Sequence, residues 1–137
     1  MGNTATQAKN IEAVQTALKA ALAGDYDRLP ALIAEDFVIY EAESLPFGGV
    51  FRGIQGYIEC MQGLNNFWAN KGLASPEFFA AGDDMVLILS VFDGYIKRNS
   101  QHVKMPTISL WKLKEGRVHS ARPFFFDTKK IVDLAAL

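Results

Sequence analysis

The sequence predicts an α+β fold in which three N-terminal helices pack on one face of a curved, mostly antiparallel sheet. Apolar residues recur at helical spacing in three segments of the first half, whereas the second half consists of strand-like segments separated by short turns. The chain has 137 residues, half of them hydrophobic, which is the size of one domain with a substantial core. We therefore expect a single domain over residues 1–137, with its core at about residues 8–130.

The helices are predicted from apolar spacing and from residues that begin or end helices. Residues 7–22 place their apolar side chains on one face. A short second helix is expected after Asp27, whose side chain can cap it, because Pro30 then falls in the first turn. A third helix follows Gly53 and is expected to end near residues 70–72.

The strands are predicted from β-branched and aromatic residues bounded by turn residues. The first opens at Asp36, and the later ones are expected at residues 76–81, 85–97, 101–113 and 117–126, before a short C-terminal helix capped by Asp127. Asp93 and Gly94 predict a bulge or bend in the second of these later strands. Two strands exceed the usual length, so the sheet must bend, and a bent sheet over helices encloses a conical cavity suited to a small apolar molecule.

Composition and charge exclude several classes of function. Fourteen basic and fifteen acidic residues give a net charge of −1 without a basic cluster, so nucleic-acid binding is not expected. The longest apolar run, residues 85–92, is too short to cross a membrane, and the first ten residues lack a signal-peptide core, so we expect a cytoplasmic protein. One cysteine and two scattered histidines do not make a metal site, and we expect no cofactor.

Glu41 and Glu43 are the candidate catalytic acids, because they end the first predicted strand two residues apart. Side chains alternate along a strand, so both would lie on one face. If that face lines an apolar cavity, burial and mutual repulsion raise the pKa of at least one carboxyl group, as a general base near neutral pH requires. The alternative interpretation is a solvated strand end, or ion pairs with Arg52 or Arg122.

Other candidate site residues are spread along the chain. Arg122 lies among apolar residues and is expected to bind a ligand carboxylate or to hold Glu41 in place, with an ion pair at a dimer face as the alternative. His102 is a candidate acid/base group at the rim of the cavity, and Ser109 is a candidate hydrogen-bond donor on the same long strand. The side chains expected to form the pocket walls are Phe47, Phe51, Met61, Trp68, Phe79, Met105 and Trp111.

Several of these segments together resemble a known superfamily. ALAGDYDRLPALIAEDF at residues 21–37, the strand that ends in acids, Phe51-Arg52-Gly53 before a helix, and the KEGRV hairpin occur in the order seen in NTF2-like proteins. The chain is most similar there to SnoaL-like and ketosteroid-isomerase-related proteins, over roughly residues 8–130. The resemblance implies a cone-shaped α+β barrel with an internal pocket, assembled as a homodimer through the outer face of the sheet.

The same resemblance implies that most of the steroid isomerase machinery is missing. The catalytic base of that chemistry falls on Glu41, but the tyrosine of the first helix falls near Ala17 and the aspartic acid of the penultimate strand falls near Ser109. Loss of one oxyanion donor costs about 10²–10³ in rate, so steroid isomerase activity is not expected. We expect a pocket for a small hydrophobic molecule, with Glu41 as base and Glu43, His102 or Ser109 polarising the ligand. The alternative is a non-catalytic binding or dimerisation module.

Overall fold

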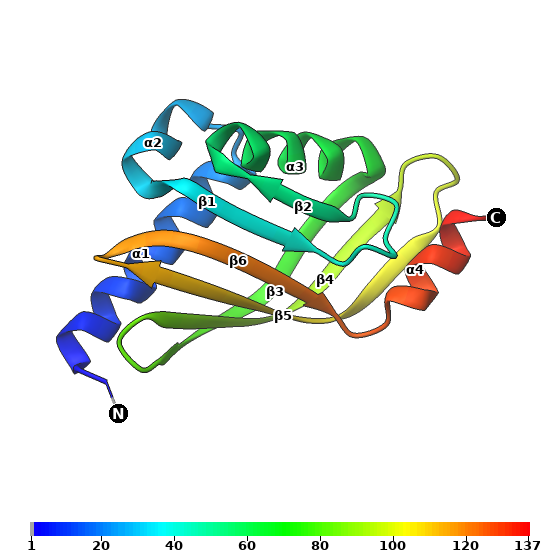
Figure 1. Cartoon of the computed structure of the whole chain (residues 1–137). Coiled ribbons are helices and arrows are strands. Elements are labelled where there is room, and N and C mark those ends of the chain that lie inside the picture. The colour runs from blue at the N-terminus through cyan, green and yellow to red at the C-terminus, as the bar shows by residue number, and fades with distance from the viewer. Residues whose placement is uncertain (1) are drawn as a thin grey trace.

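The computed structural model describes residues 2–137 and has the predicted α+β fold (Figure 1). Its helical elements are α1 (Thr4–Leu22), a 3-10 turn (Tyr26–Arg28), α2 (Leu29–Leu32), α3 (Gly53–Phe67) and α4 (Thr128–Ala135). The strands are β1 (Ile33–Glu41), β2 (Gly49–Arg52), β3 (Trp68–Ala81), β4 (Met85–Ile96), β5 (His102–Lys114) and β6 (Arg117–Phe125).

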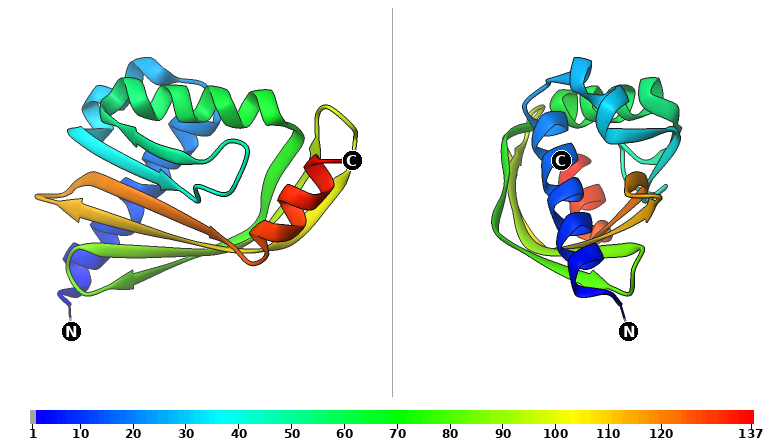
Figure 2. Two further views of the ribbon diagram at one scale, coloured as in Figure 1. Left: turned by 45° about the vertical axis from the view of Figure 1, so that its right-hand side comes forward. Right: turned by 90° about the vertical axis from the view of Figure 1, so that its left-hand side faces the viewer.

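The six strands form one curved, unclosed sheet in the order β2-β1-β6-β5-β4-β3. β1 pairs with β6 in parallel, and every other neighbouring pair is antiparallel. The helices α1 and α3 lie across the concave side of the sheet, so that the sheet and the helices face each other around an interior space (Figure 2). This arrangement gives each long strand an inner face toward the helices and an outer face toward solvent.

Two hydrophobic clusters fill the interior. The larger one joins α1, α3 and the inner sheet face, and its fully buried members include Val14, Tyr57 and Phe37. The second lies at the other end of the molecule, where Phe47 and Trp68 pack near Ile131 of α4. Asp127 accepts a hydrogen bond from the Lys130 backbone N–H at 3.1 Å, so the predicted cap of the C-terminal helix is confirmed.

Three predicted boundaries were wrong. Ile33 begins β1, whereas the first strand was expected to open at Asp36. The third helix ends at Phe67, and Trp68 enters β3 without a connecting loop. The residues expected to end that helix instead form a β-bulge, where the register of β3 against β4 shifts between Ala69 and Gly72. The backbone φ of Asn70 is +51°, a left-handed conformation that asparagine tolerates better than most residues.

The irregularity predicted at Asp93 and Gly94 lies on the partner strand. The register of β4 against β5 runs without a shift through Asp93 and Gly94, while β3 carries the extra residue opposite them.

Among residues 2–137, no helix is long and apolar enough to cross a membrane.

Candidate functional site

A cavity of about 200 Å³ opens between the helices and the inner face of the sheet. Its walls come from α1, α3 and strands β1, β3, β4, β5 and β6, and they are mainly apolar. Leu22 is about half exposed and Gly72 is exposed, and both line the cavity, so its mouth lies between the end of α1 and β3. An apolar cavity with a few polar groups is the usual form of a small-molecule site.

Glu41 is the acidic residue of this cavity. It is the last residue of β1 and shares the buried face of that strand with Phe37 and Ile39, because side chains alternate along a strand. Only 5 % of its surface is exposed. Burial raises the pKa of the Glu41 carboxyl group to about 7, against a small opposing effect of the hydrogen bond from Cys60. Glu41 can therefore exchange a proton near neutral pH.

The contacts of Glu41 leave one carboxyl oxygen free. The Cys60 thiol donates to Oε2 across 3.8 Å, whereas Oε1 is buried without a hydrogen-bond partner among residues 2–137. No basic side chain lies within 4.0 Å of Glu41 in the part of the chain that the structure describes. The expected alternative of an ion pair with Arg52 or Arg122 is thus wrong, because Arg52 is exposed and Arg122 lies on the other face of the sheet.

Tyr57 and Cys60 present neutral donors beside this carboxyl group. They lie three residues apart on α3, which places both on the helix face that packs on the sheet. Burial raises the pKa of the Cys60 thiol and of the Tyr57 hydroxyl far above neutrality, and the nearby Glu41 raises both further. Both groups therefore stay protonated when Glu41 titrates.

Ser109 and Trp111 form a second polar group on the wall made by β5. The Trp111 Nε1–H donates to Ser109 Oγ at 2.8 Å. Because that bond uses Oγ as an acceptor, the Ser109 hydroxyl proton is free to be donated to a ligand. Trp68 also lines the cavity, and its buried Nε1–H has no hydrogen-bond partner in the part of the chain that the structure describes.

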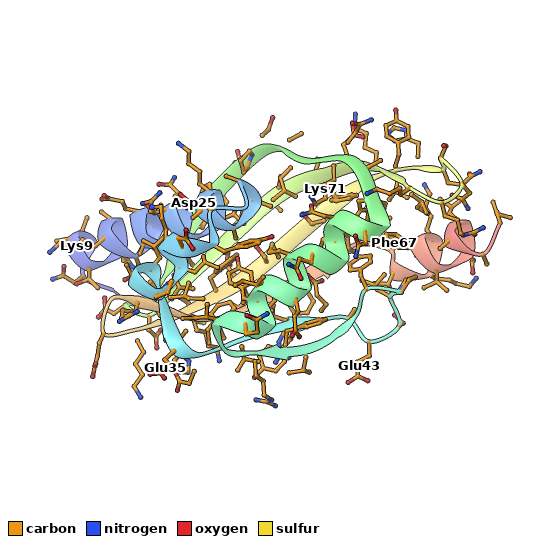
Figure 3. The ribbon with its side chains drawn as sticks, turned by 90° about the horizontal axis from the view of Figure 1, so that it is seen from above. Lys9, Asp25, Glu35, Glu43, Phe67 and Lys71 are labelled. Atoms are coloured by element: carbon orange, nitrogen blue, oxygen red, sulfur yellow. The ribbon has the colours of Figure 1, made fainter. Side chains whose placement is uncertain are left out.

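Glu43 does not share the face of Glu41. β1 ends at Glu41, and the chain then turns, with the Leu45 backbone N–H donating to the Ala42 carbonyl at 3.1 Å. Strand alternation stops at that turn, so Glu43 is exposed and points away from the body of the molecule (Figure 3). The expectation of two acids on one strand face was wrong.

Three other predicted residues lie on the outer face of the sheet. His102 is exposed, with its Nε2 at 2.7 Å from Asp93 Oδ1 and its ring stacked on Tyr95. The Arg122 guanidinium lies over the Tyr40 ring at 4.1 Å. Phe79 is 49 % exposed. Their positions are incompatible with the expected roles at the cavity, because inner and outer side chains alternate along each strand.

The predicted wall residues divide into two groups. Met61, Trp68 and Trp111 line the cavity, together with Glu41 and Ser109. Phe47, Phe51 and Met105 do not: Phe47 and Met105 belong to the second buried cluster, and Phe51 packs against the first.

Sequence reasoning missed the polar wall residues Tyr57 and Lys71, and also Cys60 beside Glu41. The spacing of Tyr57 and Cys60 on one helix face was the available signal.

Comparison with known protein families shows which family the chain belongs to. The family model described as the SnoaL-like domain matches residues 14–121, well over half of the chain. The chain belongs to the SnoaL-like family. A search of proteins with curated descriptions found no match.

Solved structures share the fold of this SnoaL-like protein. An NTF2-like protein from Burkholderia xenovorans has a TM-score of 0.85 at 23 % identity, covering 96 % of this chain and 98 % of its own. A candidate SnoaL-like polyketide cyclase from Jannaschia has a TM-score of 0.82 at 17 % identity, with coverage of 100 % and 99 %. A candidate polyketide cyclase from Xanthomonas campestris has a TM-score of 0.76 at 17 % identity, with coverage of 95 % and 98 %. At these identities, the likeness establishes the NTF2-like fold.

Proposed function

We propose that this SnoaL-like protein catalyses proton transfer on a small hydrophobic molecule, with Glu41 as the general base. The observation that carries the proposal is a buried carboxyl group with a free oxygen in an apolar cavity and a pKa of about 7. A general base works best when its pKa lies near the operating pH. Two of the solved structures with this fold are candidate polyketide cyclases. Polyketides carry carbonyl groups, which favours a carbonyl-bearing substrate for this protein.

The proposed step moves one proton and one electron pair. Ionised Glu41 takes a proton through Oε1 from a carbon next to the ligand carbonyl, so that the C–H bond breaks and the electron pair moves to the carbonyl oxygen as an enolate. The Ser109 hydroxyl donates a hydrogen bond to that oxygen, while the Trp111 N–H fixes the position of Oγ. Protonated Glu41 then returns its proton to the ligand, at the same carbon or at another one, and is regenerated.

The proposed site stabilises the developing negative charge less strongly than the site of a steroid isomerase does. Ala17, where the resemblance places the tyrosine donor, is fully buried in the core and offers no hydrogen bond. The Ser109 hydroxyl is therefore the proposed donor to the developing charge, and the unpaired Trp68 N–H is a further donor on the described cavity wall. We therefore propose activity on a substrate with a more acidic C–H bond than that of a steroid.

Solvent exchange of a ketone tests the proposal. 2-Tetralone has acidic protons next to its carbonyl, and deuterium uptake from D₂O is followed by proton NMR. We expect the wild type to accelerate uptake and Glu41→Gln to lose about 10²-fold or more of that acceleration, which is the usual contribution of a general base. Glu43→Gln is the matched control, because that acid is exposed outside the cavity. Full acceleration in Glu41→Gln refutes the base, and binding without exchange favours the non-catalytic module.

We also propose that the protein is a homodimer through the outer face of the sheet. This face exposes an apolar strip that crosses three strands, since Leu89 pairs with Ile108 and Ile108 pairs with Phe124. Contiguous exposed apolar residues of this kind usually mark an interface. Sedimentation at micromolar concentration should give a dimer, and Phe124→Glu should give a folded monomer. A monomeric wild type contradicts the proposal.

A further inference from the structure

The bulge in β3 places a lysine on the wall of the cavity. Ala69 pairs with Tyr95 on the outer face, and Gly72 pairs with Asp93, so β3 has two residues, Asn70 and Lys71, where β4 has one. Regular alternation from Ala69 would direct the side chain of Lys71 outward. The extra residue reverses the alternation, and Lys71 lines the cavity instead. Bulges often re-aim a side chain beside a functional site.

Lys71 lies at the mouth of the cavity without an acidic partner. It is half-buried, next to the exposed Gly72, and on β3 beside the C-terminal part of α3 (Figure 3). Its Nζ donates to Asn65 Oδ1 at 2.5 Å, which uses one of the three donors of an ammonium group. Within residues 2–137, no carboxylate lies within 4.0 Å of this ammonium.

A second lysine adds positive charge to the same place. Lys97 Nζ donates to the Asn65 backbone carbonyl at 2.6 Å and therefore already neutralises the C-terminal end of α3. Burial, and then the charge of Lys97, lower the pKa of Lys71. An anion bound at the mouth would favour the charged form of Lys71 and would therefore oppose both of these effects on its pKa. Capping of α3 thus explains Lys97 but leaves the position of Lys71 on the cavity wall unexplained.

We propose that Lys71 forms an anion-binding subsite at the cavity mouth, so that the preferred ligand is a hydrophobic molecule with one anionic oxygen, such as a carboxylate. This inference rests on the proposed role of the cavity as a ligand site. The acidic and basic residues of the described cavity wall are Glu41, at the end of β1, and Lys71, at the mouth. When Glu41 is protonated, the wall carries the positive charge of Lys71 alone, which favours an anion.

The size of the cavity guides the choice of probe. An apolar cavity of about 150 Å³ accommodates benzene, so a cavity of about 200 Å³ takes one aromatic ring with a short chain. 4-Phenylbutyrate fits this description, with its ring inside and its carboxylate able to reach the mouth. 4-Phenylbutanamide has the same shape without the charge. The two tryptophans of the chain, Trp68 and Trp111, both line the cavity and report binding by their fluorescence.

The test compares these two probes at pH 6.5 in four proteins. We expect the wild type to bind the acid about tenfold more tightly than the amide, as one charge-assisted hydrogen bond provides. Lys71→Met should abolish this preference by weakening binding of the acid far more than binding of the amide, and Lys71→Arg should retain most of the preference. Lys97→Met is the control for nearby positive charge that does not line the cavity, and it should reduce the preference much less than Lys71→Met does. The thermal midpoint of each variant verifies that it is folded.

Three results overturn the inference. The first is equal binding of acid and amide to the wild type. The second is an equal loss of preference in Lys97→Met and Lys71→Met, which would show a diffuse field in place of a subsite. The third is no binding of either probe. The first two results do not contradict the proposed catalysis by Glu41. Full solvent exchange in Glu41→Gln would refute that catalysis, but it would not contradict the proposed preference for anions.

Discussion

Replacing Glu41 by glutamine should stabilise the protein in a pH-dependent way. The pKa of Glu41 is about 7 in the folded chain, against 4.5 for an ordinary glutamate. Between about pH 4.5 and pH 7 the folded state binds more protons than the unfolded state, so the free energy of unfolding of the wild type falls as the pH rises. A difference of roughly two and a half units at 1.36 kcal/mol per unit gives a loss of about 3 kcal/mol, complete above pH 7. Glutamine does not titrate and avoids this loss.

Urea denaturation of the wild type and Glu41→Gln at pH 5, 6, 7 and 8.5 measures the effect. The free energy of unfolding of Glu41→Gln minus that of the wild type should increase by about 2.5 kcal/mol between pH 5 and pH 8.5, because part of the loss is already complete at pH 5. Glu43→Gln provides the control, because Glu43 is an exposed acid outside the cavity. A constant difference for Glu41→Gln as well would refute the reasoning, since the carboxyl group would then titrate equally in both states.

Two further substitutions test other parts of the structure. Trp111→Phe removes the N–H that donates to Ser109 Oγ while keeping an aromatic ring in the wall. It should slow 2-tetralone exchange about tenfold, more than it weakens binding, and an unchanged exchange rate counts against the orienting role. Asp127→Ala removes the cap of α4 and should lower the free energy of unfolding by about 1 kcal/mol in urea, whereas Asp133→Ala, nearer the end of the same helix, should cost less.

The sequence predicted those parts of the fold that local patterns determine. Apolar spacing identified α1 and α3, and the turn residues identified the hairpin between β5 and β6, where the φ angles of Glu115 and Gly116 are +53° and +77°. The start of β3 was not predicted. Pairing of Trp68 with Ile96 draws that residue into the sheet directly after the helix, and a pairing between distant strands has no local signal.

The site was predictable where strand alternation is regular. Glu41 follows the buried parity of β1, and Ser109 and Trp111 share one parity on β5. Arg122 lies on the outer face of the sheet, which contradicts its expected ligand role but not the alternative at a dimer face, and β6 contains an irregularity just before it. Val118 and Ala121 are both buried although they are three positions apart, and this shift leaves Arg122 on the outer face. The position of Lys71 depends in the same way on a bulge that only the pairing of β3 with β4 reveals.

The pH dependence of 2-tetralone exchange tests the central claim most directly. If buried Glu41 is the base, the second-order rate constant of the wild type rises with pH and levels off above an inflection near pH 7. Glu41→Gln loses both the enhanced rate and the inflection, while Glu43→Gln keeps them. A wild-type profile that inflects near pH 4.5, or an inflection near pH 7 that persists in Glu41→Gln, would contradict the assignment of Glu41 as the base.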